Sequence, residues 1–379
     1  MSPLYFDYAA ATPLAPEVLA AMQPFFSGEF YNPSAAYLAA KQVREALETA
    51  RAGVASHLGA KPSEIIFTAG GTEADNLAIH GVMRQHPDTN LVISAIEHDA
   101  VLEPAKQYPH QLLPVTKDGR VDVSKLEKLI NGRTVLVSVM LANNEIGTIQ
   151  PLREVVAVLQ KIRKKRSKQD NPLPLYLHTD ACQAAAWLDL RVARLGVDLM
   201  TINAGKIYGP KQCAALFVGS RVRLSPLMHG GGQERGLRNG TENIANFVGL
   251  AKALNMVQAA KDSEGRRLAG LQKLFYKLLE EKIPHAVVNG AKDRRLVNNV
   301  HITIPGQDNE RLLYALDEKG IQCATGSACS AASTDPSHVL KAIGLSDDDA
   351  RSSLRFTFGK GTTEEAIRML VDELVSVLE

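Results

Sequence analysis

The sequence predicts an α/β protein that combines a large domain, built on a mostly parallel sheet, with a smaller α+β domain. Between residues 50 and 220, short β-rich apolar runs alternate with helical patterns, which is typical of a parallel sheet covered by helices. A glycine-rich crossing at 229–241 ends this alternation. The length of 379 residues allows two or three domains. We assign 15–250 to the large domain, and 1–14 with 251–379 to the small one.

Six apolar runs are the candidate strands of the large sheet: 64–68, 91–95, 135–140, 175–179, 199–202 and 214–218. Several of them end in loops rich in glycine and polar residues. Because ligands of open α/β sheets lie at the carboxyl ends of the strands, we expect these loops to converge on one site. In the second half of the chain, a long helix over 244–282 precedes candidate strands at 286–288, 299–303 and 322–324, and terminal helices follow.

The composition is that of a soluble globular chain, with 45% hydrophobic and 22% charged residues. A formal net charge of +2 does not favour direct binding of nucleic acid or of an anionic membrane. We interpret the basic run at 161–168 as a solvated helix end, with a docking patch for an acidic partner as the alternative. The N-terminal residues lack an export signal and no apolar run is long enough to span a membrane, so we expect a cytoplasmic protein.

The four cysteines suggest reactivity rather than a disulfide framework. They are too few for a disulfide scaffold and form no zinc-type pair, so no metal site is expected from the chain's spacing. We interpret Cys182, Cys213 and Cys323 as structural residues. Cys329 lies in a segment rich in glycine, alanine and serine, which can move as a carrier thiol must; the alternative is a small buried apolar residue.

Residues 68–76 (TAGGTEADN) combine a strand end, a glycine turn and the start of a helix. This geometry directs backbone N–H groups and the helix dipole toward an anion, and the Thr72 hydroxyl is a further donor. The functional interpretation is a phosphate-binding turn. The alternative is a glycine turn that only caps the helix.

Two further polar residues end predicted strands. Asp180 is a carboxylate that needs a cation there, such as a pyridinium nitrogen, although it could also cap a helix. Lys206 follows the next strand, where loss of its charge would make it nucleophilic toward an aldehyde, whereas a lone loop lysine is usually solvated. A phosphate turn, a strand-end aspartate and a strand-end lysine are the contacts that pyridoxal 5'-phosphate requires.

Seven motifs carry a resemblance to a known family: 68–76 (TAGGTEADN), 97–98 (EH), 143–147 (NNEIG), 178–183 (HTDACQ), 206–211 (KIYGPK), 229–236 (HGGGQERG) and 326–330 (GSACS). With YFDYAAATP at 5–13 and Arg355, they resemble the NifS/IscS-like cysteine desulfurases. These are fold-type I enzymes of the class V aminotransferase superfamily that depend on pyridoxal phosphate. The resemblance runs nearly end to end.

The resemblance implies the roles of the cofactor-binding residues. Lys206 would form the Schiff base, Asp180 would pair with the ring nitrogen, and His98 would stack over the ring and help to move protons. The remaining implied cofactor contacts are Gly71 and Thr72 at the phosphate, Asn144 and Gln183 near the ring, and Thr241 at the phosphate of a partner subunit. A homodimer is therefore expected.

The resemblance also implies the substrate contacts and the sulfur carrier. Arg355 would hold the substrate carboxylate, for which its planar guanidinium is suited, and Asn32 would assist. Cys329 would accept the sulfur, and the long spacing that follows it resembles desulfurases whose loop reaches acceptor proteins. The family also admits a role for Cys329 as a transient iron–sulfur ligand.

Two positions depart from the family pattern. Asn203 and Gly205 stand where desulfurases usually carry a serine and a histidine that contact the cofactor phosphate. Gly205 offers only its backbone N–H, and Asn203 can donate from its amide, so we expect weaker retention of the cofactor.

The expected activity is transfer of sulfur from L-cysteine to Cys329 as a persulfide, with release of L-alanine. The sulfur would then pass to an acceptor protein, either an iron–sulfur scaffold or an enzyme of tRNA or cofactor thiolation. One alternative is a selenocysteine lyase or cysteine sulfinate desulfinase, which need not depend on Cys329. A second is a non-catalytic partner platform with the same fold.

Overall fold

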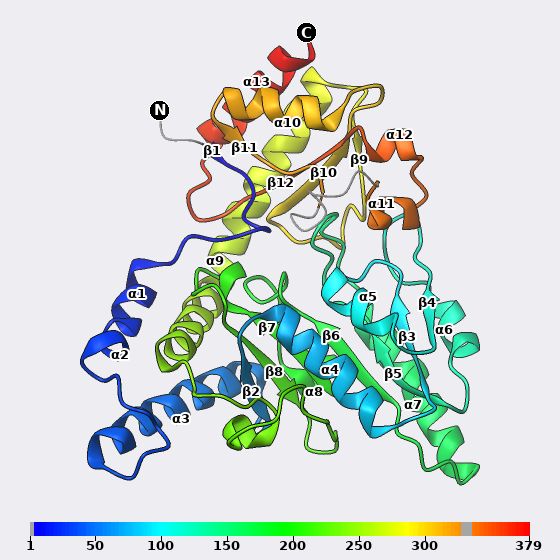
Figure 1. Ribbon diagram of the computed structural model, residues 1–379. Coiled ribbons are helices and arrows are strands. Elements are labelled where there is room, and N and C mark those ends of the chain that lie inside the picture. The colour runs from blue at the N-terminus through cyan, green and yellow to red at the C-terminus, as the bar shows by residue number, and fades with distance from the viewer. Residues whose placement is uncertain (1–3, 327–335) are drawn as a thin grey trace.

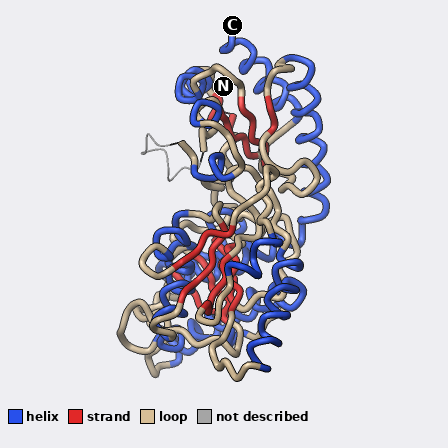
Figure 2. The backbone as a smooth tube through the Cα atoms, turned by 90° about the vertical axis from the view of Figure 1, so that its right-hand side faces the viewer, coloured by secondary structure: helices blue, strands red, loops and turns tan. Residues whose placement is uncertain are grey.

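The computed structural model describes residues 4–326 and 336–379. Figure 1 shows a large sheet with its helices in the lower half of the molecule and a smaller sheet with its helices in the upper half. Figure 2, turned by 90°, shows the two sheets one above the other. Among the residues described, no helix has both the length and the apolar character needed to cross a membrane.

The large sheet has seven strands in the order β2-β8-β7-β6-β5-β3-β4. Strand β8 runs antiparallel to both of its neighbours, and the remaining pairs are parallel. The predicted mostly parallel sheet is confirmed. The strands are β2 (Ile65–Thr68), β3 (Asn90–Ser94), β4 (His110–Leu113), β5 (Thr134–Ser138), β6 (Tyr176–Asp180), β7 (Leu199–Asn203) and β8 (Ala214–Val218).

The edge strand β4 was not predicted. Its sequence HQLL alternates poorly, and only Leu113 is fully buried, so the strand carries a weak apolar signal. The other six strands lie within two residues of the predicted runs.

Helices cover both faces of the large sheet (Figure 1). One apolar cluster joins the sheet to α4 (Gly71–Gln85) and α5 (Asp99–Ala105). A larger cluster joins the other face to α3, α7 and the first half of α9. The remaining helices of this part are α1 (Pro16–Met22), α2 (Pro24–Ser27), α3 (Leu38–Leu58), α6 (Val123–Leu129), α7 (Leu152–Lys168) and α8 (Val192–Leu195).

The basic run at the end of α7 is only partly solvated, so the predicted solvated helix end is partly wrong. Lys161 is exposed and pairs with Glu127 at 2.8 Å. Arg163, in contrast, binds the Asp198 carboxylate at 2.6 Å. Arg166 is buried and donates to backbone carbonyls, among them that of Thr134 at 2.6 Å. The two arginines also hold the loop between α7 and β6, because Arg163 donates to the Leu175 carbonyl at 2.8 Å and Arg166 to the Pro174 carbonyl at 2.9 Å.

The smaller part contains a three-stranded antiparallel sheet, β12-β10-β9, and a parallel pair, β1-β11. Strand β12 was not predicted because Arg355 interrupts its apolar pattern, although every residue of it is buried. The elements are β1 (Leu4–Tyr5), β9 (Val287–Val288), β10 (Asn299–Thr303), α10 (Asn309–Glu318), β11 (Ile321–Gln322), α11 (His338–Ala342), α12 (Asp347–Ala350), β12 (Ser353–Thr357) and α13 (Glu364–Leu378).

Helix α9 (Ile244–Lys282) connects the two parts, and its predicted bounds are confirmed. Its apolar side chains up to Val257 belong to the core of the large sheet, whereas those from Leu268 onward belong to the core of the small sheet. The helix therefore contributes to both cores. The proposed domain boundary near residue 250 stays a prediction.

Candidate active site

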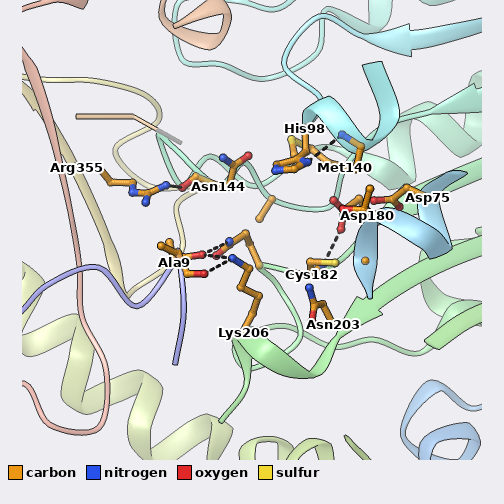
Figure 3. Close-up of a pocket in the computed structure, with 16 residues that line it drawn as sticks. Ala9, Asp75, His98, Met140, Asn144, Asp180, Cys182, Asn203, Lys206 and Arg355 are labelled. Carbon is orange, nitrogen blue, oxygen red and sulfur yellow. Dashed lines mark hydrogen bonds between the residues drawn. The ribbon is translucent and has the colours of Figure 1, made fainter. Parts of the chain in front are cut away.

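Most of the predicted site residues line one cavity, which lies at the carboxyl ends of the strands of the large sheet (Figure 3). The loops after β5, β6 and β7, the start of α4 and the start of α5 open into it, and β12 contributes from the smaller part. The predicted residues that line it are Gly71, Thr72, His98, Asn144, Asp180, Gln183, Asn203, Lys206 and Arg355. The strand-end loops thus converge, as the parallel topology requires.

The start of α4 forms one end of the cavity. No side chain caps this helix, so its first N–H groups are available to an anion. A Cβ added to Gly71 would lie 3.1 Å from the Cys182 sulfur and 3.2 Å from Asn203 Nδ2, which explains why a glycine stands here. The Thr72 hydroxyl and the Asn203 amide flank this turn. The arrangement fits a phosphate group.

The Gly205 N–H does not point into the cavity as expected, because Asn203 accepts it. The Gly205 N–H donates to Asn203 Oδ1 at 3.0 Å, and Gly205 does not line the cavity. Asn203 therefore caps its own turn with its oxygen and presents its Nδ2 toward Gly71. Because one side chain serves both purposes, the phosphate end depends on Asn203 rather than on Gly205.

Asp180 is the last residue of β6, and it lines the cavity. Its Oδ1 accepts the Cys182 N–H at 2.8 Å, so the residue also caps the turn that follows, as the alternative interpretation proposed. The Cys182 thiol is buried, and its pKa is raised by burial and by the Asp180 carboxylate. Cys182 is consequently a structural thiol and a poor nucleophile at neutral pH.

Lys206 lies in the turn after β7 and projects into the cavity between the two parts of the molecule. Its Nζ donates to the carbonyls of Ala9 at 2.8 Å and Ala10 at 2.6 Å. Gln183 donates to the same Ala9 carbonyl at 2.9 Å. The N-terminal segment therefore holds the lysine in place, a role that was not predicted. Figure 3 shows the Lys206 side chain pointing toward Ala9.

His98 is the N-cap of α5, and its Nδ1 accepts the Ala100 N–H at 3.0 Å. This bond assigns the acceptor role to Nδ1, so Nε2 carries the proton of the neutral ring. The preceding Glu97 is fully buried, and its Oε1 accepts the Met140 N–H at 2.6 Å. Burial raises the pKa of the Glu97 carboxyl.

Arg355 extends from β12 to the opposite wall of the cavity and is almost completely buried. Its Nη2 donates to Asp7 Oδ1 at 2.6 Å, and its Nη1 donates to the Asn144 carbonyl at 3.0 Å. The Nε atom is buried and has no hydrogen-bond partner among the residues that the structure describes. The guanidinium is thus held in a fixed orientation at the cavity.

Asp75 is a pocket residue that sequence reasoning missed. It lines the cavity next to Asp180 and is 1% exposed. Its position gave a usable signal, because it lies three residues after Thr72 on α4 and so faces the same side of the helix.

Besides Gly205, three predicted site residues lie outside the cavity or outside the described chain. Asn32 is exposed, and its Oδ1 accepts the Ser34 N–H at 2.9 Å. Thr241 is also exposed, beyond the glycine-rich crossing. Cys329 lies outside the described residues.

The glycine-rich crossing is attached by one ion pair to α3 and by another to the first turn of α4. Glu234 binds Arg51 with two oxygens at 2.7 Å and accepts the Phe67 N–H at 2.8 Å. Arg238 donates to Glu73, whose other oxygen accepts the Ala69 N–H at 3.0 Å. Thr241, three residues after Arg238, is therefore held close to a firmly anchored segment.

Of the remaining cysteines in the described chain, Cys213 is buried and Cys323 is partly buried. Burial raises the pKa of Cys213, and it raises that of Cys323 to about 12. Both are structural thiols, as their sequence context predicts. In the described ranges 4–326 and 336–379, no cluster of three or more histidine, cysteine or carboxylate side chains could hold a metal ion.

Comparisons with known proteins show the family to which the chain belongs. The aminotransferase class-V family matches residues 4–370. The cysteine desulfurase IscS of Dictyoglomus turgidum is 41% identical over 383 residues, covering 99% of this chain and 94% of the relative. A solved NifS-like protein has a TM-score of 0.90 at 30% identity, with 99% of each chain covered. The structure of SspA in complex with cysteine has a TM-score of 0.79 at 34% identity and covers 93% of this chain and 98% of SspA. The chain therefore belongs to the class-V aminotransferase family and, within it, to the cysteine desulfurases.

Proposed function

We propose that the cavity binds pyridoxal 5'-phosphate and that the protein uses it to transfer sulfur from L-cysteine to Cys329, with release of L-alanine. One observation carries the proposal: a helix N-terminus, a buried carboxylate and a lysine amine all open into one cavity. Relatives named cysteine desulfurase over almost the full chain support the activity. They favour it over a selenocysteine lyase, a cysteine sulfinate desulfinase or a non-catalytic platform.

The chemistry of the donor set fits this cofactor. Gly71 and Thr72, with the Asn203 amide, suit a phosphate at the start of α4. Asp180 suits a protonated ring nitrogen, and Lys206 suits the aldehyde. When bound, the cofactor supplies the electron sink that makes a substrate α-proton acidic.

Lys206 and His98 are the residues that move protons in this proposal. The Lys206 amine, once displaced by the substrate amine, takes the α-proton, and the carbonyls of Ala9 and Ala10 hold it in position. His98 assists through Nε2 because its Nδ1 is occupied by the Ala100 N–H.

Arg355 binds the substrate carboxylate. Asp7 fixes one edge of the guanidinium, and the buried Nε is left as a donor for a carboxylate. The known complex of SspA with cysteine supports a cysteine-sized substrate for this group of folds. We assign Asn32 to the substrate or to a partner subunit's site on the strength of the family resemblance alone.

Cys329 accepts the sulfur. Its thiolate attacks the substrate sulfur, an S–S bond forms, and the C–S bond breaks with its electron pair left on the substrate Cβ. Protonation of Cβ and return of a proton from Lys206 to Cα then give alanine. The other three cysteines are buried or partly buried thiols with raised pKa values, which makes them unsuited to this role.

The assembly and location complete the proposal. We infer a cytoplasmic homodimer in which Thr241 of one subunit reaches the cofactor phosphate of the other. The exposure of Thr241 and Asn32 away from their own cavity supports this arrangement. An acceptor protein, either an iron–sulfur scaffold or a tRNA-thiolation enzyme, then takes the sulfur from Cys329.

The test compares alanine release from L-cysteine by the wild-type protein and by Cys329→Ser. Loss of alanine release in the variant is expected, with the visible absorbance of the bound cofactor unchanged. Full activity of the variant would instead support a lyase or desulfinase. Cofactor binding without alanine release by the wild-type protein would support a non-catalytic platform.

A further inference from the structure

A second carboxyl group, that of Asp75, lies beside Asp180 in the cavity. Asp75 projects from α4 and lines the same cavity, and Figure 3 shows the two carboxyl groups next to each other. Asp75 Oδ1 lies 3.4 Å from His178 Nε2, and the Thr201 hydroxyl hydrogen-bonds the same carboxyl group. The established chemistry of the site assigns no task to Asp75.

The basic side chain that lies against Asp75 is a histidine without charge. His178 is fully buried, and burial lowers its pKa to about 4, so the ring is neutral at pH 7. Its Nδ1 is hydrogen-bonded to Ser138 Oγ at 2.9 Å. Among the described residues, no lysine or arginine forms an ion pair with Asp75.

The other titratable groups that face this region come from four elements of the cavity. Asp180 from β6 repels a charge on Asp75, and His98 at the start of α5 weakly favours it. The remaining ones are Glu97 before α5, the Cys182 thiol after β6 and Lys206 after β7, which is held by two carbonyls. Burial is the largest influence, and with Asp180 it raises the pKa of Asp75 well above its ordinary value.

Two neighbouring buried carboxyl groups cannot both be ionised without a large cost. Their hydrogen bonds decide which of the two carries the charge. Asp180 accepts a backbone N–H, from Cys182 at 2.8 Å, and such a donor stabilises the charged form. Asp75 Oδ1 has no hydrogen-bond partner among the described residues. The backbone donor therefore favours a negative charge at the position of Asp180 over one at Asp75.

We propose that Asp75 is a neutral carboxylic acid, and that it acts as a positioning residue by confining the negative charge of the pair to Asp180. With its Nδ1 bonded to Ser138, His178 has its Nε2 at 3.4 Å from Asp75 Oδ1 as the acceptor within reach of this proton. An ionised Asp75 would place a second negative charge near the cofactor ring, at a position other than that of Asp180. This inference rests on the proposed pairing of Asp180 with the ring nitrogen.

The first test uses the protein without cofactor. Infrared spectra of wild type and Asp75→Asn, recorded at neutral pH, should differ by the carbonyl band of one protonated carboxylic acid. Asp262→Asn, at an exposed position, is the matched control and should remove no such band. A wild-type spectrum that loses only a carboxylate band in Asp75→Asn would overturn the proposal.

The second test examines the coupling of the two carboxyl groups. In Asp180→Asn the repelling charge is gone, so the pH at which the Asp75 band disappears should fall by about one unit or more. An unchanged pH would mean that Asp180 does not keep Asp75 neutral, and the proposal would then fail.

The third test uses the bound cofactor, whose absorbance reports the charge near its ring. Since Asn imitates a neutral acid, Asp75→Asn should leave the pH midpoint of the absorbance change within about 0.3 unit of the wild-type value. A shift of about one unit would show that a charge was removed and would contradict the proposal. If pyridoxal phosphate does not bind the wild-type protein at all, the proposed function fails while the infrared result stands on its own.

Discussion

Two opposite walls of the cavity, here called the floor and the roof, carry side chains of opposite charge. The floor comprises Thr72, Asp75, Asp180 and Asn203, from the large sheet and α4, and its two carboxyl groups have no cationic partner among the described residues. The roof is formed by Arg355 from β12, whose charge is compensated by Asp7 at 2.6 Å. In Figure 3, Arg355 and the pair Asp75–Asp180 lie on opposite sides of the cavity, with Lys206 between them.

In the proposed function, this difference would orient a zwitterionic substrate on a cationic cofactor ring. An uncompensated buried carboxylate is costly and becomes favourable when a cation binds beside it. A guanidinium that is already paired on one edge can bind a carboxylate on another edge without leaving either charge alone. The floor is therefore suited to the ring nitrogen, and the roof to the substrate carboxylate.

The largest expected effect is at Lys206, which lies between floor and roof. Lys206→Ala removes both the amine that bonds the cofactor aldehyde and the base that takes the α-proton. We expect the rate of alanine release to fall by about 10³-fold or more, together with loss of the lysine-dependent cofactor absorbance. A variant that keeps half of the wild-type rate would exclude Lys206 from the chemistry.

Asp180→Asn tests the floor. Loss of the carboxylate under the ring nitrogen should lower kcat by about 10²- to 10³-fold, because a charge developed in the transition state is no longer stabilised. The Asn side chain can still accept the Cys182 N–H, so the fold should be retained, as circular dichroism can verify. An unchanged kcat would remove the distinction between the two regions.

Arg355→Gln tests the roof. A hydrogen bond to a charged group contributes about 1.5–3 kcal/mol, so the KM for L-cysteine should rise by about 10- to 100-fold. The affinity for pyridoxal phosphate should change far less, which steady-state kinetics and cofactor titration can separate. If cofactor affinity fell as much as substrate affinity, the roof would not be specific to the substrate.

Asn203→Ala tests the phosphate end of the floor. Loss of the amide donor should weaken cofactor binding by about 5- to 10-fold, the value of one hydrogen bond of about 1 kcal/mol. Gly205→Ala is the matched comparison, since an added Cβ would meet no atom closer than 3.5 Å. Dialysis followed by cofactor titration measures both. A larger effect at Gly205 would restore the contact that the sequence suggested.

The smallest effect concerns the stability of the protein without cofactor. Because the folded state raises the pKa of Asp75, the folded protein retains a proton that the unfolded chain loses above about pH 4. Stability is therefore lost as the pH rises from that value toward the folded pKa. Asp75→Asn removes this loss, so its melting temperature relative to wild type should increase between pH 4 and pH 7. A constant difference, measured beside Asp262→Asn, would contradict the assignment.

Sequence reasoning located the floor better than the roof. Thr72, Asp180 and Lys206 follow apolar strands, and a parallel sheet brings such ends together, so their convergence could be predicted. Strand β12, which carries Arg355, was missed because three of its five residues are polar although all of them are buried.

Other features of the site, among them its backbone hydrogen bonds, could not be predicted from the residue pattern. The carbonyls of Ala9 and Ala10 hold Lys206, but backbone acceptors are common to every residue. The bond from the Gly205 N–H to Asn203 depends on the geometry of one turn. Asn32 and Thr241 stay predictions whose test requires the second subunit.

The central claim is that this cavity moves sulfur from L-cysteine to Cys329. The most direct measurement is the mass of the peptide that contains Cys329 after the protein, loaded with pyridoxal phosphate, has reacted with L-cysteine in the absence of a reductant. The account predicts the mass of one additional sulfur atom on that peptide in the wild-type protein, with alanine formed in equal amount, and no such addition in Lys206→Ala. Alanine formed without a persulfide on Cys329, or a persulfide on Cys182, Cys213 or Cys323 instead, would contradict it.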